Sequence, residues 1–173
     1  MKEEELLKKS LINLIKSADY QLGILENGGT ELNVIKLYGR PETRKMALYC
    51  ILDLLKPYKF NSVVGRGIGG TPIATEVADA RNANLVLYSP KSRDRTGNAL
   101  KAYNLEKTDT IVLVDDVISR NKYLGIKTMI SEIEKTKADL VGCFFIAKTN
   151  DVVWDLDTEY AYVIDAKKDI FNL

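Results

Sequence analysis

The chain has 173 residues, of which 46% are hydrophobic, and 25 Lys and Arg stand against 24 Asp and Glu. This length and composition predict one globular domain, residues 1–173, large enough to bury a core. The net charge of +1 excludes a strongly basic surface over the whole molecule, although a local patch stays open. Histidine is absent, which excludes Ser-His-Asp and Cys-His catalysis and the commonest zinc ligand. Any chemistry must therefore use carboxylates, Lys, Arg, hydroxyls, backbone amides or an oxygen-bound metal such as Mg²⁺.

Two features of the sequence bear on where the protein works. No apolar run approaches the roughly 18 residues that span a membrane, and Met1–Glu5 does not read as a signal peptide. Cys50 and Cys143 lie in apolar segments without a close partner, which predicts buried thiols in a reducing compartment. We therefore expect a cytoplasmic protein with no membrane partner.

The first half of the chain alternates amphipathic segments with short apolar runs. The amphipathic segments predict helices at residues 2–18, from Arg40–Thr43 onward, and from Thr71 to about Asn82. The apolar runs predict strands at residues 33–37, 60–64 and 85–88. Between them, Gly65–Pro72 predicts a glycine-rich turn in which Thr71 caps the next helix and Pro72 lies in its first turn.

The second half continues this alternation after a long polar segment. Residues from Ser89 to about Lys107 are polar and cationic, and a connection of this length predicts a functional flap or a disordered segment. Strands are expected at residues 110–114, 140–147 and 160–164, and a helix from about Tyr123 to Lys135. This order predicts the α/β class, with a doubly wound, mostly parallel sheet and a small hood formed by the terminal segments.

Two adjacent carboxylates follow the most apolar strand of this expected sheet. Ile111–Val114 is a continuous apolar run, typical of a strand buried on both faces, and Asp115 and Asp116 come directly after it. Ligands bind at the carboxyl ends of the strands in such sheets. A lone Asp here would be explained by capping of the next helix. A pair in this place favours a functional site.

The glycine-rich turn comes after a strand and opens a helix, which favours an anion site. Gly65, Gly67 and Gly70 match the letters of a dinucleotide fingerprint, but no acidic residue follows about 20 positions later, and no P-loop lysine follows Gly70. Arg66 could add a charge-assisted contact to a phosphate. The alternative is a tight connection whose glycines serve packing only.

The flap carries Lys91, Arg93 and Arg95 at alternate positions, so in an extended ribbon their side chains would project from one face. A charge-rich loop of this kind is usually a solvated surface. Beside a phosphate site, however, a cationic arm could close over a polyanionic leaving group.

Taken together, Gly65–Ala74, Pro90–Asn98 and Ile111–Ser119 resemble the type I phosphoribosyltransferases, and most of all orotate phosphoribosyltransferase. The resemblance implies that a base nitrogen, that of orotate in this branch, attacks 5-phosphoribosyl 1-pyrophosphate (PRPP). Pyrophosphate then leaves in a Mg²⁺-dependent reaction of pyrimidine biosynthesis. The implied partners are small molecules, PRPP and a nucleobase, and a second copy of the chain in a homodimer. No nucleic-acid partner is expected.

The resemblance also implies a role for each matching residue. Asp115 and Asp116 would hold the ribose hydroxyls, with Mg²⁺ bound through the substrate near them and not directly by the protein. Arg66 and the amides around Gly67 would face the pyrophosphate. The flap residues would close over it, in this family typically across a dimer interface; they are Lys91, Arg93 and Arg95.

The expected 5′-phosphate loop departs from the family pattern of small residues and glycine. Here the segment consists of Ser119, Arg120, Asn121, Lys122 and Tyr123. Ser119 matches the pattern, and Asn121 reaches positive φ more readily than most residues. Arg120 and Lys122 either attract the phosphate or fill its place, and Tyr123 is bulky where a small hydroxyl is expected.

Two further positions differ from the orotate branch. Arg95 stands where that branch has histidine, and Lys148 follows the strand ending at Ala147 where that branch has Asp-Arg. Lys148 is the candidate partner for a substrate carboxylate, as a point charge and not as a bidentate fork.

These features support two main hypotheses. The first is an enzyme, an orotate-type phosphoribosyltransferase. The second is a catalytically impaired relative that binds a nucleotide or sugar phosphate and acts as a regulator, which the altered phosphate loop favours. A weaker option is a structural partner of an active paralogue. The sequence leaves open which base is the acceptor.

Overall fold

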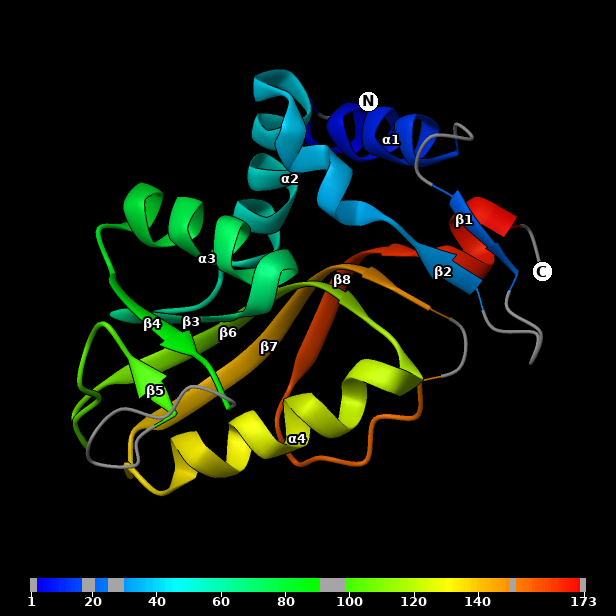
Figure 1. Cartoon of the computed structure of the whole chain (residues 1–173). Helices are drawn as coiled ribbons and strands as arrows, with labels where there is room; N and C mark the ends of the chain where they lie inside the picture. The colour runs from blue at the N-terminus through cyan, green and yellow to red at the C-terminus, as the bar shows by residue number, and fades with distance from the viewer. Residues whose placement is uncertain (1–2, 17–20, 25–29, 91–98, 150–151, 172–173) are drawn as a thin grey trace.

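A six-stranded sheet with the order β5-β4-β3-β6-β7-β8 forms the centre of the molecule (Figure 1). The computed structural model describes residues 3–16, 21–24, 30–90, 99–149 and 152–171. Within them the sheet is formed by β3 (Ser62–Arg66), β4 (Asn84–Tyr88), β5 (Leu100–Lys101), β6 (Thr110–Ile118), β7 (Asp139–Lys148) and β8 (Tyr160–Asp165). Pairing is parallel from β4 across to β8 and antiparallel between β4 and β5. A separate antiparallel pair is formed by β1 (Gln21–Ile24) and β2 (Thr30–Leu32).

Helices cover both faces of this sheet, as Figure 1 shows. The helical elements are α1 (Glu3–Ile15), the 3₁₀ helix η2 (Val34–Gly39), α2 (Pro41–Leu54), α3 (Gly67–Arg81), α4 (Arg120–Glu134) and the π-helix η3 (Ala166–Phe171). Val112 and Val114 of β6 share one core cluster with α1, α2 and α3. Ile111 and Leu113 share the other with α4, because successive side chains of a strand face opposite ways. The predicted doubly wound, mostly parallel α/β sheet is confirmed.

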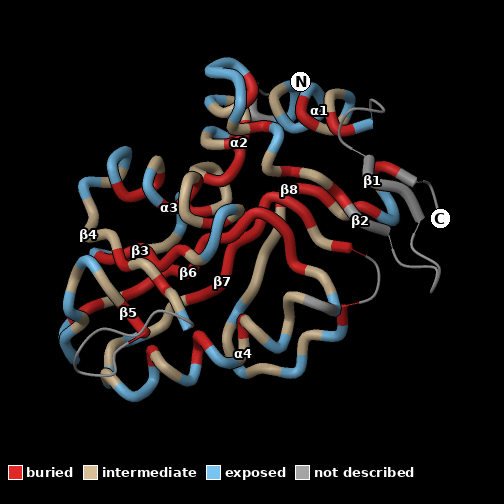
Figure 2. The backbone as a smooth tube through the Cα atoms, in the orientation of Figure 1, coloured by how far each residue is buried: buried red, intermediate tan, exposed pale blue. Residues whose placement is uncertain are grey.

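The two ends of the described chain lie together at one side of the sheet. Helix α1 contacts both β8 and η3, and the β1–β2 pair lies on the same side of the molecule (Figure 1). This group corresponds to the expected hood of terminal segments. Figure 2 shows that the central strands are buried, whereas the helices expose their outer sides.

The burial of both cysteines agrees with the sequence analysis. Cys50 and Cys143 are both buried and unpaired. Among the described residues, no helix combines the length and apolar character that crossing a bilayer needs.

Strand β6 is longer than its apolar run predicts. The predicted end at Val114 is wrong, because β7 continues to pair with β6 through Asp115 and Val117 to Ile118. The pairing with β3 on the other side stops at Leu113. Asp115 and Asp116 therefore lie within a strand, but beyond the point at which its pairing with β3 stops.

The glycine-rich segment is the start of a helix and not a separate turn. Arg66 occupies the N-cap position with an extended backbone, and Gly67 turns the chain into α3 with φ of +60°. The prediction that Thr71 caps this helix is wrong, since Thr71 lies inside it and its carbonyl accepts a hydrogen bond from the Thr75 hydroxyl. The predicted end is confirmed, because Asn82 adopts a left-handed conformation as the C-cap.

Two other predictions of secondary structure are wrong, one of an element's type and one of a helix start. Residues 33–37 form most of η2 and not a strand, because Val34 and Leu37 are both buried and residues three apart share one side of a 3₁₀ helix. Helix α4 begins at Arg120 and not near Tyr123. Its first turn is polar, so apolar periodicity does not reveal it.

The core predicts a clear effect for Phe144, which is fully buried in β7 and meets the Tyr58 ring edge-on at 4.8 Å between centroids. Phe144→Ala should lower the free energy of unfolding by about 3–5 kcal/mol, since it removes buried apolar area and leaves a cavity. Guanidinium denaturation measures this. Val153→Ala, at a residue that is 80% exposed, is the control and should change little. Equal shifts for the two variants would contradict the packing described.

Candidate functional site

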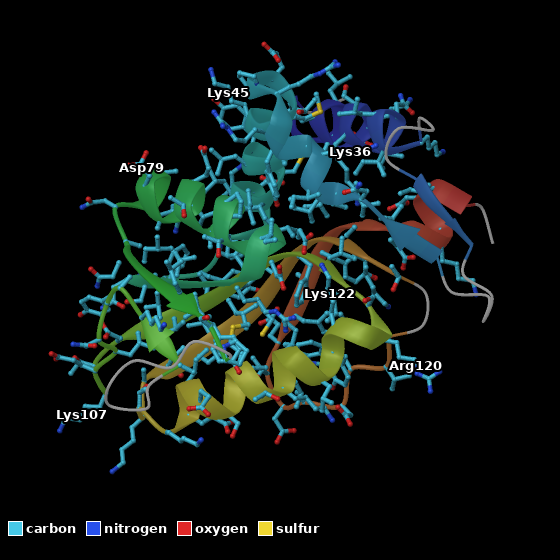
Figure 3. All side chains as sticks on the ribbon, viewed as in Figure 1. Lys36, Lys45, Asp79, Lys107, Arg120 and Lys122 are labelled. Atoms are coloured by element: carbon cyan, nitrogen blue, oxygen red, sulfur yellow. The ribbon has the colours of Figure 1, made fainter. Side chains whose placement is uncertain are left out.

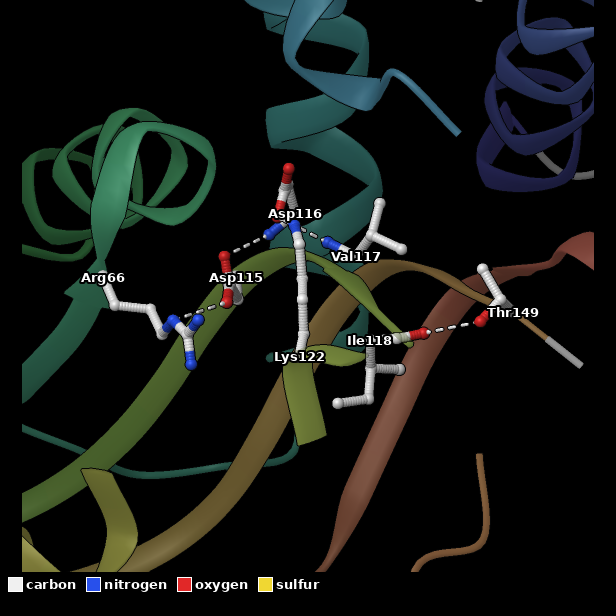
Figure 4. Close-up of polar contacts among 7 residues, drawn as sticks. All are labelled: Arg66, Asp115, Asp116, Val117, Ile118, Lys122 and Thr149. Carbon is white, nitrogen blue, oxygen red and sulfur yellow. Dashed lines mark hydrogen bonds and ion pairs between the residues drawn. The ribbon is translucent and has the colours of Figure 1, made fainter. Parts of the chain in front are cut away.

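The acidic pair, Asp115 and Asp116, is buried at the carboxyl-terminal part of β6, with only 2% and 5% of each residue exposed. Each carboxylate is bound by the next backbone amide (Figure 4). The N–H of Asp116 donates to Asp115 Oδ1 at 2.9 Å, and the N–H of Val117 donates to Asp116 Oδ1 at 2.7 Å. These bonds hold the two side chains against their own strand.

Each acid has a cationic neighbour from a different element. Lys122, in the first turn of α4, places its Nζ 2.7 Å from Asp116 Oδ1. Arg66, at the end of β3, places its Nε 3.8 Å from Asp115 Oδ2. Arg66 Nη1 and Asp115 Oδ2 are both buried without a hydrogen-bond partner among the described residues. The Arg66–Asp115 pair is therefore a loose one, whereas the Lys122–Asp116 pair is close.

Glycines let helices α3 and α4 approach the acidic pair and Arg66 closely. A Cβ atom on Gly69 would overlap the Asp116 carboxylate, and one on Gly70 would overlap that of Asp115. A Cβ on Gly125 of α4 would overlap the Arg66 guanidinium. The first turn of α3 can therefore lie directly against the acids, where the positive end of its helix dipole stabilises negative charge. Gly69 and Gly70 thus serve close packing, while Gly67 makes the turn.

Burial raises the pKa of Asp115. The value rises from 3.8 to about 8, mainly through burial and next through the charge of Asp116, whereas Lys122 and Arg66 act in the opposite direction. Asp115 therefore keeps its proton to a higher pH than an exposed aspartate does.

The segment expected to bind the 5′-phosphate is the junction of β6 and α4. Ser119 is the N-cap, and its carbonyl accepts from the amides of Lys122 and Tyr123. Arg120 is exposed and points outward, whereas Lys122 lies between α4 and the sheet (Figure 3). The side chain of Asn121 lies outside the described residues.

Tyr123 turns away from the acidic pair. Its hydroxyl donates a hydrogen bond to Asp155, its ring lies 5.6 Å from that of Trp154, and the Lys127 ammonium lies over it at 4.9 Å. These contacts hold Tyr123 against the segment between β7 and β8, so this bulky side chain does not fill the place of a phosphate.

Lys148 lies at the carboxyl end of β7, where its backbone pairs with Ile118 of β6. Its ammonium lies over the rings of Tyr162 and Tyr160, 5.2 and 6.0 Å from the centroids. It is thus directed toward β8, and it makes no hydrogen bond or ion pair with the acidic pair within the described residues.

The structure therefore brings together four of the predicted site residues, which are Arg66, Asp115, Asp116 and Lys122, with Gly67 adjacent. The flap residues Lys91, Arg93 and Arg95 lie outside the described residues. Sequence reasoning missed Tyr38, at the end of η2, whose buried hydroxyl is considered below. Nothing in its sequence context marks it, since the preceding residues suggest an ordinary strand.

The raised pKa of Asp115 predicts a pH-dependent stability. Because the folded-state value of about 8 exceeds the ordinary 3.8, stability from this group is full below about pH 4 and is lost as pH rises toward 8. Asp115→Asn should therefore become more stable relative to the wild type by roughly 1–3 kcal/mol between pH 5 and pH 8.5. Urea denaturation across this range measures the difference. The exposed Asp79→Asn on α3 is the control, and a constant difference for Asp115→Asn would contradict the shift.

Comparison with known proteins places this site in a familiar fold. No protein-family model matches the chain. A curated relative, the orotate phosphoribosyltransferase of Caldanaerobacter subterraneus subsp. tengcongensis, is 19% identical over 153 residues, which cover 88% of this chain and 78% of that protein.

Solved structures agree with this relative. The phosphoribosyltransferase from Corynebacterium diphtheriae superposes with a TM-score of 0.78 at 16% identity, covering 96% of this chain and 99% of that one. The orotate phosphoribosyltransferase from Aeropyrum pernix gives 0.77 at 17% identity, covering 94% and 98%. An adenine phosphoribosyltransferase from Thermoanaerobacter pseudethanolicus gives 0.68 at 12% identity, covering 90% and 98%.

One similar protein is much longer. The chain spans 37% of the UMP synthase of Leishmania donovani, with a TM-score of 0.73 at 16% identity. The predicted resemblance is confirmed: the chain has the fold of the type I phosphoribosyltransferases, and orotate phosphoribosyltransferases are among the proteins most similar to it.

Proposed function

We propose that the protein is a Mg²⁺-dependent phosphoribosyltransferase that transfers the 5-phosphoribosyl group of PRPP to orotate and releases pyrophosphate. The observation that carries the proposal is the buried acidic pair at the carboxyl end of the central strand, against the first turn of α3. This is the edge at which open α/β sheets bind ligands. The proteins that share the fold are enzymes of this reaction type.

The acidic pair would bind the ribose. A carboxylate accepts hydrogen bonds only, and vicinal sugar hydroxyls can donate to it. In the transfer, a base nitrogen forms a bond to the anomeric carbon while the bond from that carbon to the pyrophosphate oxygen breaks, and pyrophosphate leaves with the electron pair. Positive charge then develops on the sugar. A buried Asp116 carboxylate would stabilise this charge strongly, because the site is shielded from water.

The leaving pyrophosphate would lie at the N-terminus of α3. Backbone N–H groups there point outward from the helix and favour anions. Arg66 adds a guanidinium whose Nη1 has no hydrogen-bond partner among the described residues, so it can donate to a phosphate oxygen.

Mg²⁺ would be held mainly by the substrate. This ion usually keeps several waters and takes one or two carboxylates together with substrate phosphates. The acidic pair fits that pattern, since Asp115 Oδ2 has no hydrogen-bond partner within the part of the chain that the structure describes. The described residues contain no group of three or more possible metal ligands, so a cage made by the protein is not part of the proposal. When bound, the ion would neutralise charge on the pyrophosphate.

The 5′-phosphate would bind at the N-terminus of α4. The Ser119 hydroxyl and the Lys122 ammonium are the side-chain donors there, and the helix dipole favours an anion at this end. Lys122 would have to leave Asp116 to reach the phosphate, which a flexible four-carbon side chain allows.

Orotate is supported as the base by the names of the relatives and by Lys148, a cation at the same edge of the sheet that could meet a substrate carboxylate. Adenine phosphoribosyltransferases share the fold as well, so purine bases belong in any test. The cationic flap and the homodimer remain predictions from the sequence.

A specific observation favours the second candidate, a regulator that binds a nucleotide or sugar phosphate without turnover. The Lys122–Asp116 pair of 2.7 Å occupies an acid that ribose would need, and α4 begins where a glycine loop would hold the 5′-phosphate.

A direct assay separates the two candidates. PRPP and Mg²⁺ are incubated with orotate, uracil, adenine, guanine or xanthine, and pyrophosphate release is measured. We expect release with orotate, and its loss by at least about a hundredfold in Asp116→Asn, since one preorganised charge is removed. Asp79→Asn is the matched control. Release with no base, together with thermal stabilisation by nucleotides, would favour the regulator.

The role of Lys122 has its own test. Lys122→Ala should raise the KM for PRPP by about tenfold, because a charge-assisted contact to phosphate contributes about 1.5 kcal/mol or more. Lys127→Ala, on the same helix but paired with Asp155, is the control. A lower KM in Lys122→Ala would mean that this lysine competes with the substrate, and would contradict its role in binding the phosphate.

A further inference from the structure

Tyr38 is the penultimate residue of the 3₁₀ helix η2, which lies beside the strand that carries the acidic pair. Val34 and Leu37 anchor η2 in the core, and η2 contacts α2, α3 and β6. The Tyr38 ring packs against the core cluster that contains Val114 and Val117, the residues that flank the acidic pair on β6. Tyr38 therefore belongs to the same side of the sheet as α3 and to the same cluster as the neighbours of Asp115 and Asp116.

The hydroxyl of Tyr38 is buried and has no hydrogen-bond partner among the described residues, although the residue as a whole is half-buried. A buried hydroxyl without a partner is unfavourable, and native structures rarely retain one without a reason. The ring alone would be supplied equally well by phenylalanine. The hydroxyl therefore needs a role outside the ligand-free packing.

Burial and charge keep this hydroxyl protonated. Burial raises the pKa of Tyr38 well above its ordinary value, and the charges of Asp116 and Asp115 raise it further. Tyr38 is thus a hydrogen-bond donor near two carboxylates, yet it donates to neither of them in the structure. Asp116 Oδ1 already accepts from the Val117 amide and from Lys122.

A sugar diol would satisfy this arrangement. Each hydroxyl of ribose donates one hydrogen bond and accepts others, whereas a carboxylate only accepts. Two carboxylates can therefore take the protons of the diol but leave its oxygen lone pairs without donors. A nearby phenol hydroxyl supplies a donor, and Arg66 Nη1 is a second buried donor without a hydrogen-bond partner.

We propose that Tyr38 is a third sugar-binding residue, whose hydroxyl donates a hydrogen bond to a ribose hydroxyl that itself donates to the acidic pair. The proposal rests on the proposed function and names a residue that the family resemblance did not imply. It also assigns specificity, since a site built to bind a hydroxyl rejects an analogue that lacks it.

The test is Tyr38→Phe, which removes only the hydroxyl. Binding of ribose 5-phosphate and of 2-deoxyribose 5-phosphate is measured by calorimetry, and unfolding temperature is measured without ligand. We expect the Kd for ribose 5-phosphate to rise about tenfold, because one hydrogen bond in a buried site is lost. The Tm without ligand should stay equal or rise, since an unsatisfied hydroxyl is removed.

In an assay of turnover, the KM for PRPP should rise more than kcat falls. Tyr49→Phe, at a tyrosine of α2 that is 54% exposed, is the matched control.

The possible outcomes are distinct. If the wild type binds ribose 5-phosphate and Tyr38→Phe binds it equally well, Tyr38 has no role in sugar binding and the inference is overturned. A lower Tm with unchanged Kd would show a structural partner for the hydroxyl, such as a buried water, and would overturn it as well. If the wild type binds neither ribose 5-phosphate nor PRPP, the proposed function fails first and the role of Tyr38 fails with it.

Discussion

The burial of two adjacent carboxylates in the central strand is the constraint on which the rest of the site depends. Moving an unpaired charge away from water is very costly, so each acid must be protonated, paired or hydrogen-bonded. The structure uses all three means. The pKa of Asp115 is raised, Asp116 is paired with Lys122, and both accept bonds from their own backbone. Such an arrangement is a poor way to gain stability, because apolar residues of similar size would do at least as well. Its cost is best explained by function.

The surrounding elements follow from that constraint. Helix α3 can present its N-terminus to the acids only because Gly69 and Gly70 carry no side chain. Gly125 does the same for α4 and the Arg66 guanidinium. The glycines that resemble a nucleotide-binding turn in the sequence thus have a physical reason that does not depend on any ligand. The same close approach also puts helix N-termini, which favour anions, beside the acids that would hold a sugar.

The sequence allowed the fold, the acidic pair and Arg66 to be predicted. It did not reveal the end of β6, the start of α3 or the place of Tyr38. The apolar run and the two acids locate β6, and Arg66 follows a second buried strand, so these residues were found from local pattern. The extension of β6 depends on pairing with β7, which is not local. The start of α3 depends on the positive φ of Gly67 and on packing against the acids. Tyr38 was missed because apolar residues at 34 and 37 suit a 3₁₀ turn as well as a strand, and only the tertiary contacts of η2 with α3 and β6 bring it near the strand that carries the acidic pair.

The choice between enzyme and regulator depends on Lys122, which can pair either with Asp116 or with a bound phosphate. Arg66 is confined, since its guanidinium lies between Asp115 and the backbone of Gly125. Lys122 is not confined in this way, because its ammonium is a compact charge on a flexible chain that is about one-third exposed. While it neutralises Asp116, it occupies the carboxylate that the proposed sugar would need. A phosphate bound at the N-terminus of α4 would be a second anion close to Lys122. If the Lys122 ammonium moved to this phosphate, Asp116 would become available to the ribose. Binding of the phosphate and exposure of the acid would then be one coupled event, so a ligand must carry both a phosphate and a diol to bind well.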